Sequence, residues 1–306
     1  MTKRSAAAFA LVSVMTCWAA RPAPAQQRFQ AVLDAKLAAA IHEVEAGLDG
    51  VLGLALKDLT AGKTLFINER EVFPQASSIK IAVLFEVFKQ AEEGRLGLGE
   101  LVAVDEARKV PGSGVLVHLG HPGLSLSVRD LAVLMVVLSD NTATNLLIDR
   151  VGLGAVDKRL DGLGLPKTRL RRRMMDLKAA AEGRENVSTP FEMMTLLEKI
   201  WRGPALKEPY RKDLLGILAI PKDSPLRAGV AEGVEVAEKP GELEAVRCDS
   251  GIVGLPGRPY ILSVMTTYLK RDGDGNPAIA EISRIVYGHM SRLARSSDIG
   301  RVVSDK

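Results

Sequence analysis

The segments with β-strand character lie near the two ends of the chain, and a long stretch of helical character separates them. Toward the N-terminus, residues 51–59 and 64–68 are rich in apolar residues and flank a short turn. Toward the C-terminus, residues 234–239, 243–253 and 260–268 have the same character. Strands so far apart can share one sheet only if the two ends of the chain come together. The sequence therefore predicts an α+β fold with one antiparallel sheet assembled from both ends.

The helical segments are identified by the spacing of their apolar residues and by their boundary signals. Leu33, Leu37 and Ile41 recur at four-residue intervals before a glycine-containing stop. Ser127 followed by Asp130 is a typical start signal for a central helix. The predicted helices cover residues 29–46, 77–93, 127–138, 141–150, 189–201 and 277–294.

The order of these elements predicts a domain organisation. Residues 26–72 and 216–306 are expected to form a discontinuous sheet domain, and residues 73–215 an inserted all-helical domain. Such an arrangement leaves a cleft between the two parts, and sites of chemistry often lie in clefts of this kind.

The first 25 residues have the pattern of a secretory signal peptide. Lys3 and Arg4 precede an apolar run over residues 6–15, and residues 23–25 supply a small-x-small cleavage site. A lipoprotein signal would need a small residue before Cys17, where threonine stands instead. We therefore expect a mature chain that starts at Gln26 and is periplasmic or secreted.

Composition excludes several classes of function. Of the 306 residues, 47% are hydrophobic and 25% charged, as in ordinary globular proteins. The net charge of +4 falls to +1 without the signal peptide, whose three basic residues have no acidic counterpart, so nucleic-acid binding is not expected. No other stretch is apolar over the ~18 residues that a membrane span needs. Cys248 is then the only cysteine, and the four histidines lack zinc-site spacing, so we expect a monomer without disulfide, metal or cofactor.

Three short motifs carry the candidate chemistry. Residues 77–80 match S-x-x-K, residues 139–141 are S-D-N, and residues 239–241 are K-P-G, which departs from K-T-G at its middle position. Each motif alone is weak, because S-x-x-K occurs by chance about once in a chain of this length. Their order and their positions at helix and strand boundaries make the combination informative.

The first motif predicts a serine nucleophile with a lysine base. At three-residue spacing on a helix, the Ser77 hydroxyl and the Lys80 amine share one face, close enough for proton transfer. Lysine accepts a proton only if burial or a nearby cation such as Lys239 lowers its pKa. An exposed helix lysine is the alternative, but the apolar neighbours at residues 79–84 favour burial. The helix start also offers N–H groups to a developing oxyanion.

The second motif lies at a junction between two predicted helices. Ser139 could relay a proton to a leaving nitrogen, and Asn141 could orient Lys80 or hold a substrate amide. The alternative is ordinary helix capping by Asp140 or Asn141.

The third motif is expected at the end of an edge strand, because proline is tolerated in a sheet only where no ladder donor is needed. Gly241 would allow a substrate backbone to approach closely, and the N–H of Glu242 would join that of Ser77 as an oxyanion hole. Lys239 would supply positive charge for a substrate carboxylate. Arg247 could assist it, or be a surface strand residue.

Together these residues resemble the class A serine β-lactamases and the wider penicillin-recognising serine enzymes. The resemblance covers most of the chain after the signal peptide, including residues 73–76, 139–147 and 168–170. It implies a five-stranded antiparallel sheet flanked by helices, with an added all-helical domain. It also implies acylation of Ser77 by a β-lactam or a D-Ala-D-Ala-like peptide, as small-molecule partner.

The chain departs from the family pattern at two places. Class A enzymes release the acyl group with a water activated by a glutamate, which an asparagine four residues later helps to hold; counting from residues 168–170, these positions fall on Met174 and Lys178. Neither side chain can act as the base. Asp176 could replace it if the loop shifts by two residues, or could cap or salt-bridge the loop. Pro240 also removes a hydroxyl that would contact the substrate carboxylate.

Several functions therefore stay open at this stage. The first hypothesis is a class A β-lactamase-like hydrolase with slow deacylation. The second is a penicillin-binding D,D-peptidase that uses the same residues. A protein that is acylated once and stays acylated is a non-enzymatic alternative. A glutaminase of similar fold is disfavoured by the signal peptide, and an α/β-hydrolase by the absence of G-x-S-x-G.

Overall fold

The computed structural model describes residues 25–119, 123–203, 205–297 and 299–302. The predicted signal peptide therefore lies outside the described residues, apart from its last residue, Ala25. Within the described ranges, no helix combines the length and the apolar character needed to cross a membrane.

The centre of the molecule is a five-stranded antiparallel sheet with the strand order β2-β1-β9-β8-β7. β1 and β9 are neighbours, with Leu54 opposite Val264, so the two ends of the chain meet within one sheet as predicted. The strands are β1 Val51–Asp58, β2 Thr64–Ile67, β7 Val236–Leu243, β8 Val246–Val253 and β9 Tyr260–Thr267. The α+β fold with a five-stranded antiparallel sheet is confirmed.

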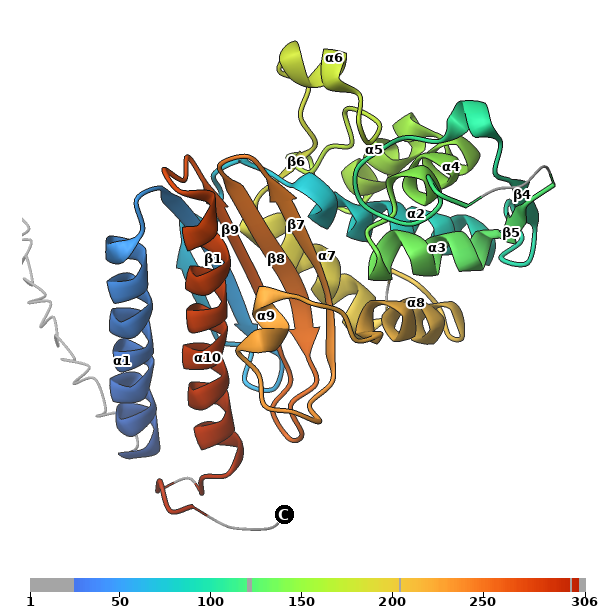
Figure 1. The fold of residues 1–306 in the computed structure, drawn as a ribbon. Helices are drawn as coiled ribbons and strands as arrows, with labels where there is room; N and C mark the ends of the chain where they lie inside the picture. The colour runs from blue at the N-terminus through green and yellow to red at the C-terminus, as the bar shows by residue number, and fades with distance from the viewer. Residues whose placement is uncertain (1–24, 120–122, 204, 298, 303–306) are drawn as a thin grey trace, which may run out of the picture.

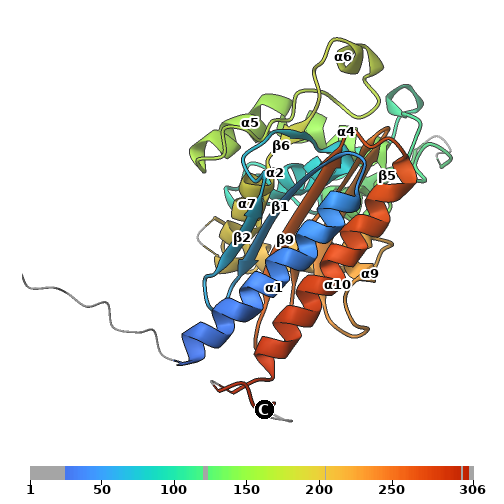
Figure 2. The same cartoon turned by 90° about the vertical axis from the view of Figure 1, so that its left-hand side faces the viewer.

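Helices cover both faces of this sheet. α1 (Ala25–Gly47) and α10 (Gly275–Ala294) run side by side along one face, as Figures 1 and 2 show. Their apolar residues pack on alternate residues of β1 such as Leu52, Leu54 and Leu56, all buried. α7 (Pro190–Arg202) packs against the other face. Because both faces are covered, every residue of β8 is buried.

Most of the remaining helices gather on the side of the sheet where β7 forms the edge, whereas α9 and η3 pack against α10 (Figure 1). α2 lies at the centre of this group and contacts α3, α4, α5 and α8. The bounds are η1 Ala76–Ile79, α2 Lys80–Glu92, η2 Glu106–Arg108, α3 Val128–Val137, α4 Asn141–Val151, α5 Leu153–Gly162, α6 Leu177–Ala181, α8 Tyr210–Ala219, α9 Pro225–Ala228 and η3 Asp272–Asp274. Two short ladders, β3 Phe73–Pro74 with β6 Val187–Ser188 and β4 Leu101–Ala103 with β5 Ser125–Ser127, complete the fold.

The predicted helices are all present, and the start signal at residue 127 is confirmed. The Ser127 hydroxyl oxygen accepts a hydrogen bond from the Asp130 N–H at 3.0 Å and caps α3. α5, α6, α8 and α9 were not predicted. Glycines at positions 152, 154 and 162 interrupt the pattern of α5, and α8 begins directly after Pro209.

Two of the boundaries that differ from the prediction lie at the motif residues. β7 continues through the K-P-G triplet to Leu243 instead of ending at Lys239. Pro240 is compatible with this because β7 is an edge strand and one side of its backbone needs no ladder partner. The predicted helix over residues 77–93 begins as the tighter η1 turn and becomes α-helical only at Lys80.

Candidate active site

Ser77 lies in η1, directly before α2, and the edge strand β7 holds this turn in place. The Ser78 hydroxyl donates to the carbonyl oxygen of Lys239 at 3.0 Å, and the Ser78 N–H donates to the Gln75 carbonyl oxygen at 2.8 Å. Ala76 has a positive φ of 46°, which costs free energy in a residue other than glycine. The packing of β7 against η1 therefore supports a turn that would be unfavourable in isolation.

The Lys80 amine is buried and has three hydrogen-bond acceptors. Nζ donates to the Ser139 carbonyl oxygen at 2.7 Å, to the Ser139 hydroxyl oxygen at 3.0 Å, and to Oδ1 of Asn141 at 3.1 Å. Burial lowers the pKa of Lys80 well below its ordinary value; the nearby charge of Lys239 lowers it further, and Asp140 opposes both effects. A lysine in this environment is suited to accept a proton from the serine one turn before it.

In the S-D-N segment, Asp140 caps a helix, and Ser139 and Asn141 contact Lys80. The Asp140 carboxylate accepts hydrogen bonds from the N–H groups of Ala143 at 2.8 Å, Val115 at 2.7 Å and Leu116 at 2.8 Å, so it caps α4 and anchors the loop before α3. Ser139 has a positive φ of 53°. Capping by Asp140 thus leaves the side chains of Ser139 and Asn141 for the amine.

Gly241 brings β7 into close contact with the nucleophile turn. A Cβ atom at this position would lie 2.5 Å from the Gln75 carbonyl oxygen, 2.7 Å from the Ser78 nitrogen and 3.0 Å from the Ser77 nitrogen. Only glycine allows this approach. It places the backbone that leads into Glu242 beside the backbone of Ser77, as the predicted oxyanion hole requires.

We expect Gly241→Ala to separate β7 from η1. The overpacking should lower the free energy of unfolding by about 1–3 kcal/mol, and misplacement of the oxyanion donors should slow the reaction of Ser77 by about 10²-fold. Gly288→Ala on α10 is the matched control, since a Cβ there meets no atom within 4 Å. Thermal unfolding and labelling of Ser77 measure both effects; unchanged stability and labelling would contradict the close packing.

The motif residues meet around a cavity of about 430 Å³. Ser77, Ser139, Lys239, Gly241 and Glu242 line it, while Lys80 and Asn141 are not among its lining residues. Other lining residues were not predicted, because they carry no motif and come from three distant segments: Ser113, Asp223, Ser224, Pro225, Ala228, Asn276, Pro277 and Ala280.

Lys239 supplies a buried cation at this cavity. Nζ donates to the Pro240 carbonyl oxygen at 2.9 Å. Burial lowers the pKa of Lys239 to about 8, with Lys222 acting in the same direction and the carboxylates of Asp249 and Glu238 opposing it. The side chain is therefore mostly protonated at pH 7 and available to an anionic group.

Arg247 is neither exposed nor a lining residue of the cavity. Its guanidinium donates to the carbonyl oxygens of Leu243 at 2.6 Å and Val246 at 2.8 Å, and it forms an ion pair with Glu242 at 2.8 Å. Only 6% of Arg247 is exposed, so the alternative of a surface strand residue is wrong. Its assistance to Lys239 stays a prediction.

The loop that carries Met174 is fixed to α4. The Met174 N–H donates to Oδ1 of Asn145 at 2.9 Å, and Nδ2 of Asn145 donates back to the Met174 carbonyl oxygen at 3.0 Å. Asn145 lies one helical turn after Asn141, the residue that contacts Lys80. Met174 is 7% exposed, packs in the core around α2 and is not among the residues that line the cavity.

The carboxylate nearest in sequence is used elsewhere. Oδ1 of Asp176 accepts a hydrogen bond from the Ala179 N–H at 2.9 Å and caps α6, which protrudes from the molecule in Figure 1. Lys178 is exposed on the same short helix. Neither Asp176 nor Lys178 lines the cavity.

Comparison with known proteins agrees with this arrangement. The profile of the beta-lactamase enzyme family matches residues 36–290. Beta-lactamase L2 of Stenotrophomonas maltophilia is 31% identical over 246 residues, covering 78% of this chain and 80% of the relative. An imipenem-hydrolyzing beta-lactamase of Enterobacter cloacae is 29% identical and covers 82% of this chain and 88% of the relative.

Solved structures give the same result. PBP-A has a TM-score of 0.78 and 30% identity, covering 84% of this chain and 97% of that one. A beta-lactamase from Sphaerobacter thermophilus has a TM-score of 0.77 and 33% identity over 84% of this chain and 97% of that one. A PBP-A variant was also solved as an acyl-enzyme complex with penicillin G, with a TM-score of 0.78. The chain is therefore a hydrolase of the class A β-lactamase family.

Proposed function

We propose that β-lactams acylate Ser77 and that the acyl group leaves slowly. The observation that carries this proposal is the buried Lys80 amine, which is held by Ser139 and Asn141, together with a loop fixed to Asn145 that carries Met174 where the family resemblance expects a base. The first part of this arrangement supports acylation, and the second lacks the base that hydrolysis needs.

The acylation step follows from the placement of the groups. Neutral Lys80 takes the Ser77 proton as the hydroxyl oxygen bonds to the β-lactam carbonyl carbon, whose oxygen becomes an anion between the N–H groups of Ser77 and Glu242. Lys80 then returns a proton through the Ser139 hydroxyl, 3.0 Å away, to the lactam nitrogen as the C–N bond breaks. The product is an ester on Ser77 with a neutral Lys80.

Deacylation needs a water molecule and a group that removes its proton. A positioned base is worth about 10²–10⁴-fold, and a methionine supplies none. Among the described residues that line the cavity, the carboxylates are Asp223 and Glu242, and Glu242 is paired with Arg247. The ester should therefore persist far longer than in an enzyme with a base at position 174.

The substrate and the location complete the proposal. The relatives named as beta-lactamases and the penicillin G complex of the PBP-A variant favour β-lactams as the acylating molecules. A D-Ala-D-Ala-like peptide would use the same residues and defines the alternative, a D,D-peptidase. The pattern of residues 1–25 supports a periplasmic or secreted protein, where both molecules occur.

One experiment separates these activities. The protein without residues 1–25 is mixed with a chromogenic cephalosporin, and colour and intact mass are followed over time. A persistent adduct with little further colour supports slow deacylation, and steady colour without adduct would instead show efficient hydrolysis. Absence of an adduct together with release of D-Ala from a peptide would show a peptidase.

The pH dependence of acylation tests the role of Lys80. The base must be neutral, so the acylation rate should rise with pH through the lowered pKa of Lys80. Because the charge of Lys239 contributes to this lowering, Lys239→Gln should raise the pKa of Lys80 and move the rising limb to higher pH. Stopped-flow measurements with an uncharged β-lactam ester separate this change in the pKa of Lys80 from the role of Lys239 in binding a carboxylate. If the rising limb stays at the same pH in Lys239→Gln, the charge of Lys239 does not influence Lys80.

A further inference from the structure

One wall of the cavity is formed by the segment that enters α9, and Ser224 lies at its start. The Ser224 oxygen accepts a hydrogen bond from the Arg227 N–H at 3.1 Å and caps α9. The residue is 4% exposed and lines the same cavity as Lys239 and Pro240. A serine hydroxyl that accepts at a cap still has a hydrogen to donate.

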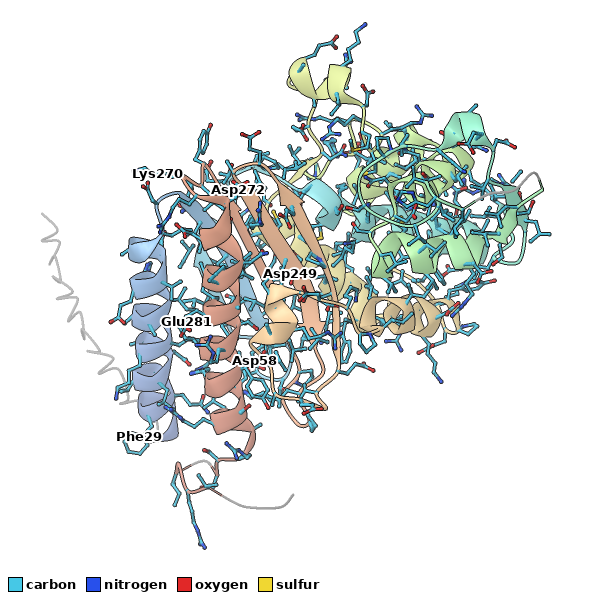
Figure 3. The ribbon with its side chains drawn as sticks, viewed as in Figure 1. Phe29, Asp58, Asp249, Lys270, Asp272 and Glu281 are labelled. Atoms are coloured by element: carbon cyan, nitrogen blue, oxygen red, sulfur yellow. The ribbon has the colours of Figure 1, made fainter. Side chains whose placement is uncertain are left out.

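A buried carboxylate lies behind this wall. Asp249 is opposite Pro240 in the β7–β8 ladder, so the two side chains share one face of the sheet. Figure 3 labels Asp249 beside α9. One of its oxygens, Oδ2, accepts from the Leu226 N–H at 3.0 Å, and the other, Oδ1, has no hydrogen-bond partner among the described residues. The Leu226 N–H belongs to the first turn of α9, which Ser224 caps, so the carboxylate and the capping serine meet at the same helix end.

The charged groups around Asp249 do not neutralise it directly. β7 contributes Glu238 and Lys239, and the segment entering and forming α9 contributes Lys222 and Arg227. Lys222 and Arg227 both pair with Glu238, at 2.6 and 3.0 Å. Within the described chain, Asp249 is left without an ion pair, although it is fully buried.

We propose that Ser224 is a specificity-determining residue for substrates that carry a carboxylate, and that an ionised Asp249 behind the same wall opposes their binding. This inference rests on the proposed acylation of Ser77. Pro240 has neither a hydroxyl nor an N–H to offer to a substrate carboxylate. In its place, Lys239 supplies the charge and Ser224 the directed hydrogen bond from the neighbouring wall.

The arrangement makes carboxylate recognition depend on pH. An ionised Asp249 repels a substrate carboxylate, whereas a protonated Asp249 does not. Burial, and next the charge of Glu238, raise the pKa of Asp249 to about 7. The preference for an anionic substrate should therefore be strongest below pH 7 and weaken as the pH rises through that value.

The test compares penicillin G with its methyl ester, which has no free carboxylate. The ratio of their rate constants for acylation of Ser77, followed by intact mass, cancels the titration of Lys80 because both substrates need the same base. Ser224→Ala should lower this acid-to-ester ratio about tenfold, the usual effect of losing a hydrogen bond to a charged group. Ser224→Thr keeps the hydroxyl and should keep the ratio, and Pro240→Thr added to Ser224→Ala should restore part of it.

The pH arm compares Asp249→Asn with the unaltered protein at acidic pH, where Lys239, whose pKa is about 8, stays charged; the fall of the ratio as the pH approaches 7 should be absent in the variant. Ser224→Gly, tolerated at helix caps, replaces the alanine variant if that variant fails to fold. An equal loss with acid and ester, or a pH step that persists in Asp249→Asn, would overturn the inference. Failure of the proposed function would look different, because neither substrate would then label Ser77 in the unaltered protein.

Discussion

Replacement of Ser77 by alanine is expected to abolish the covalent adduct with β-lactams. The remaining turnover should fall by about 10³-fold or more, because the ester cannot form without the hydroxyl and Lys80 has no other serine one turn before it. Intact mass after incubation with penicillin G measures the adduct directly. The fold should be retained, since Ser77 lines the cavity and packs in neither of the apolar cores.

Ser78→Ala is the matched control for this experiment. Ser78 is fully buried, and its hydroxyl is used to hold η1 against β7. The variant should lose some stability but still form the adduct. An undiminished adduct in Ser77→Ala would reject the assignment of the nucleophile, and loss of the adduct in Ser78→Ala alone would transfer it to the neighbouring residue.

The double change Met174→Glu with Lys178→Asn is expected to accelerate deacylation by about 10²–10⁴-fold. Asn145 holds position 174 through backbone atoms only, so the loop should keep its place when the side chain changes. A carboxyl group at this buried position would have a raised pKa and be suited to accept a proton from water. Decay of the preformed adduct, followed by intact mass, gives the rate.

Met174→Gln with Lys178→Asn is the control, because glutamine has nearly the shape of glutamate but does not act as a base. Equal acceleration in both double variants would mean that the loop had merely loosened. An unchanged rate in the glutamate variant would show that the catalytic water lies elsewhere.

The sequence predicted those parts of the molecule that depend on local spacing. Ser77 and Lys80 lie in the continuous turn from η1 into α2, and the capping of α3 by Ser127 depends on a hydrogen bond three residues away. The sheet could be predicted because its strands are apolar and because the segments between them have apolar residues at helical spacing. The domain boundaries stay a prediction.

The parts that could not be predicted depend on contacts between distant segments. Ser224 and Ala280 line the cavity with Ser77, but nothing in their local sequence indicates that α9 and α10 reach it. The prediction about position 174 needed the family resemblance, and the attachment of Met174 to Asn145 became visible only in the structure. β7 was predicted too short because Pro240 interrupts strand propensity wherever the edge position of the strand is unknown.

The pairing of β1 with β9 has a consequence for how the chain acquires its structure. Leu54 and Val264 are neighbours in space but are separated by most of the polypeptide, so the central ladder can close only after nearly the whole chain has left the ribosome. Until then β1 has a partner on one side only, and its other edge is exposed to pairing with foreign strands. Closure of the β1–β9 ladder is therefore expected to be a late step of folding, and the open edge of β1 is a site where mispairing can occur before that step.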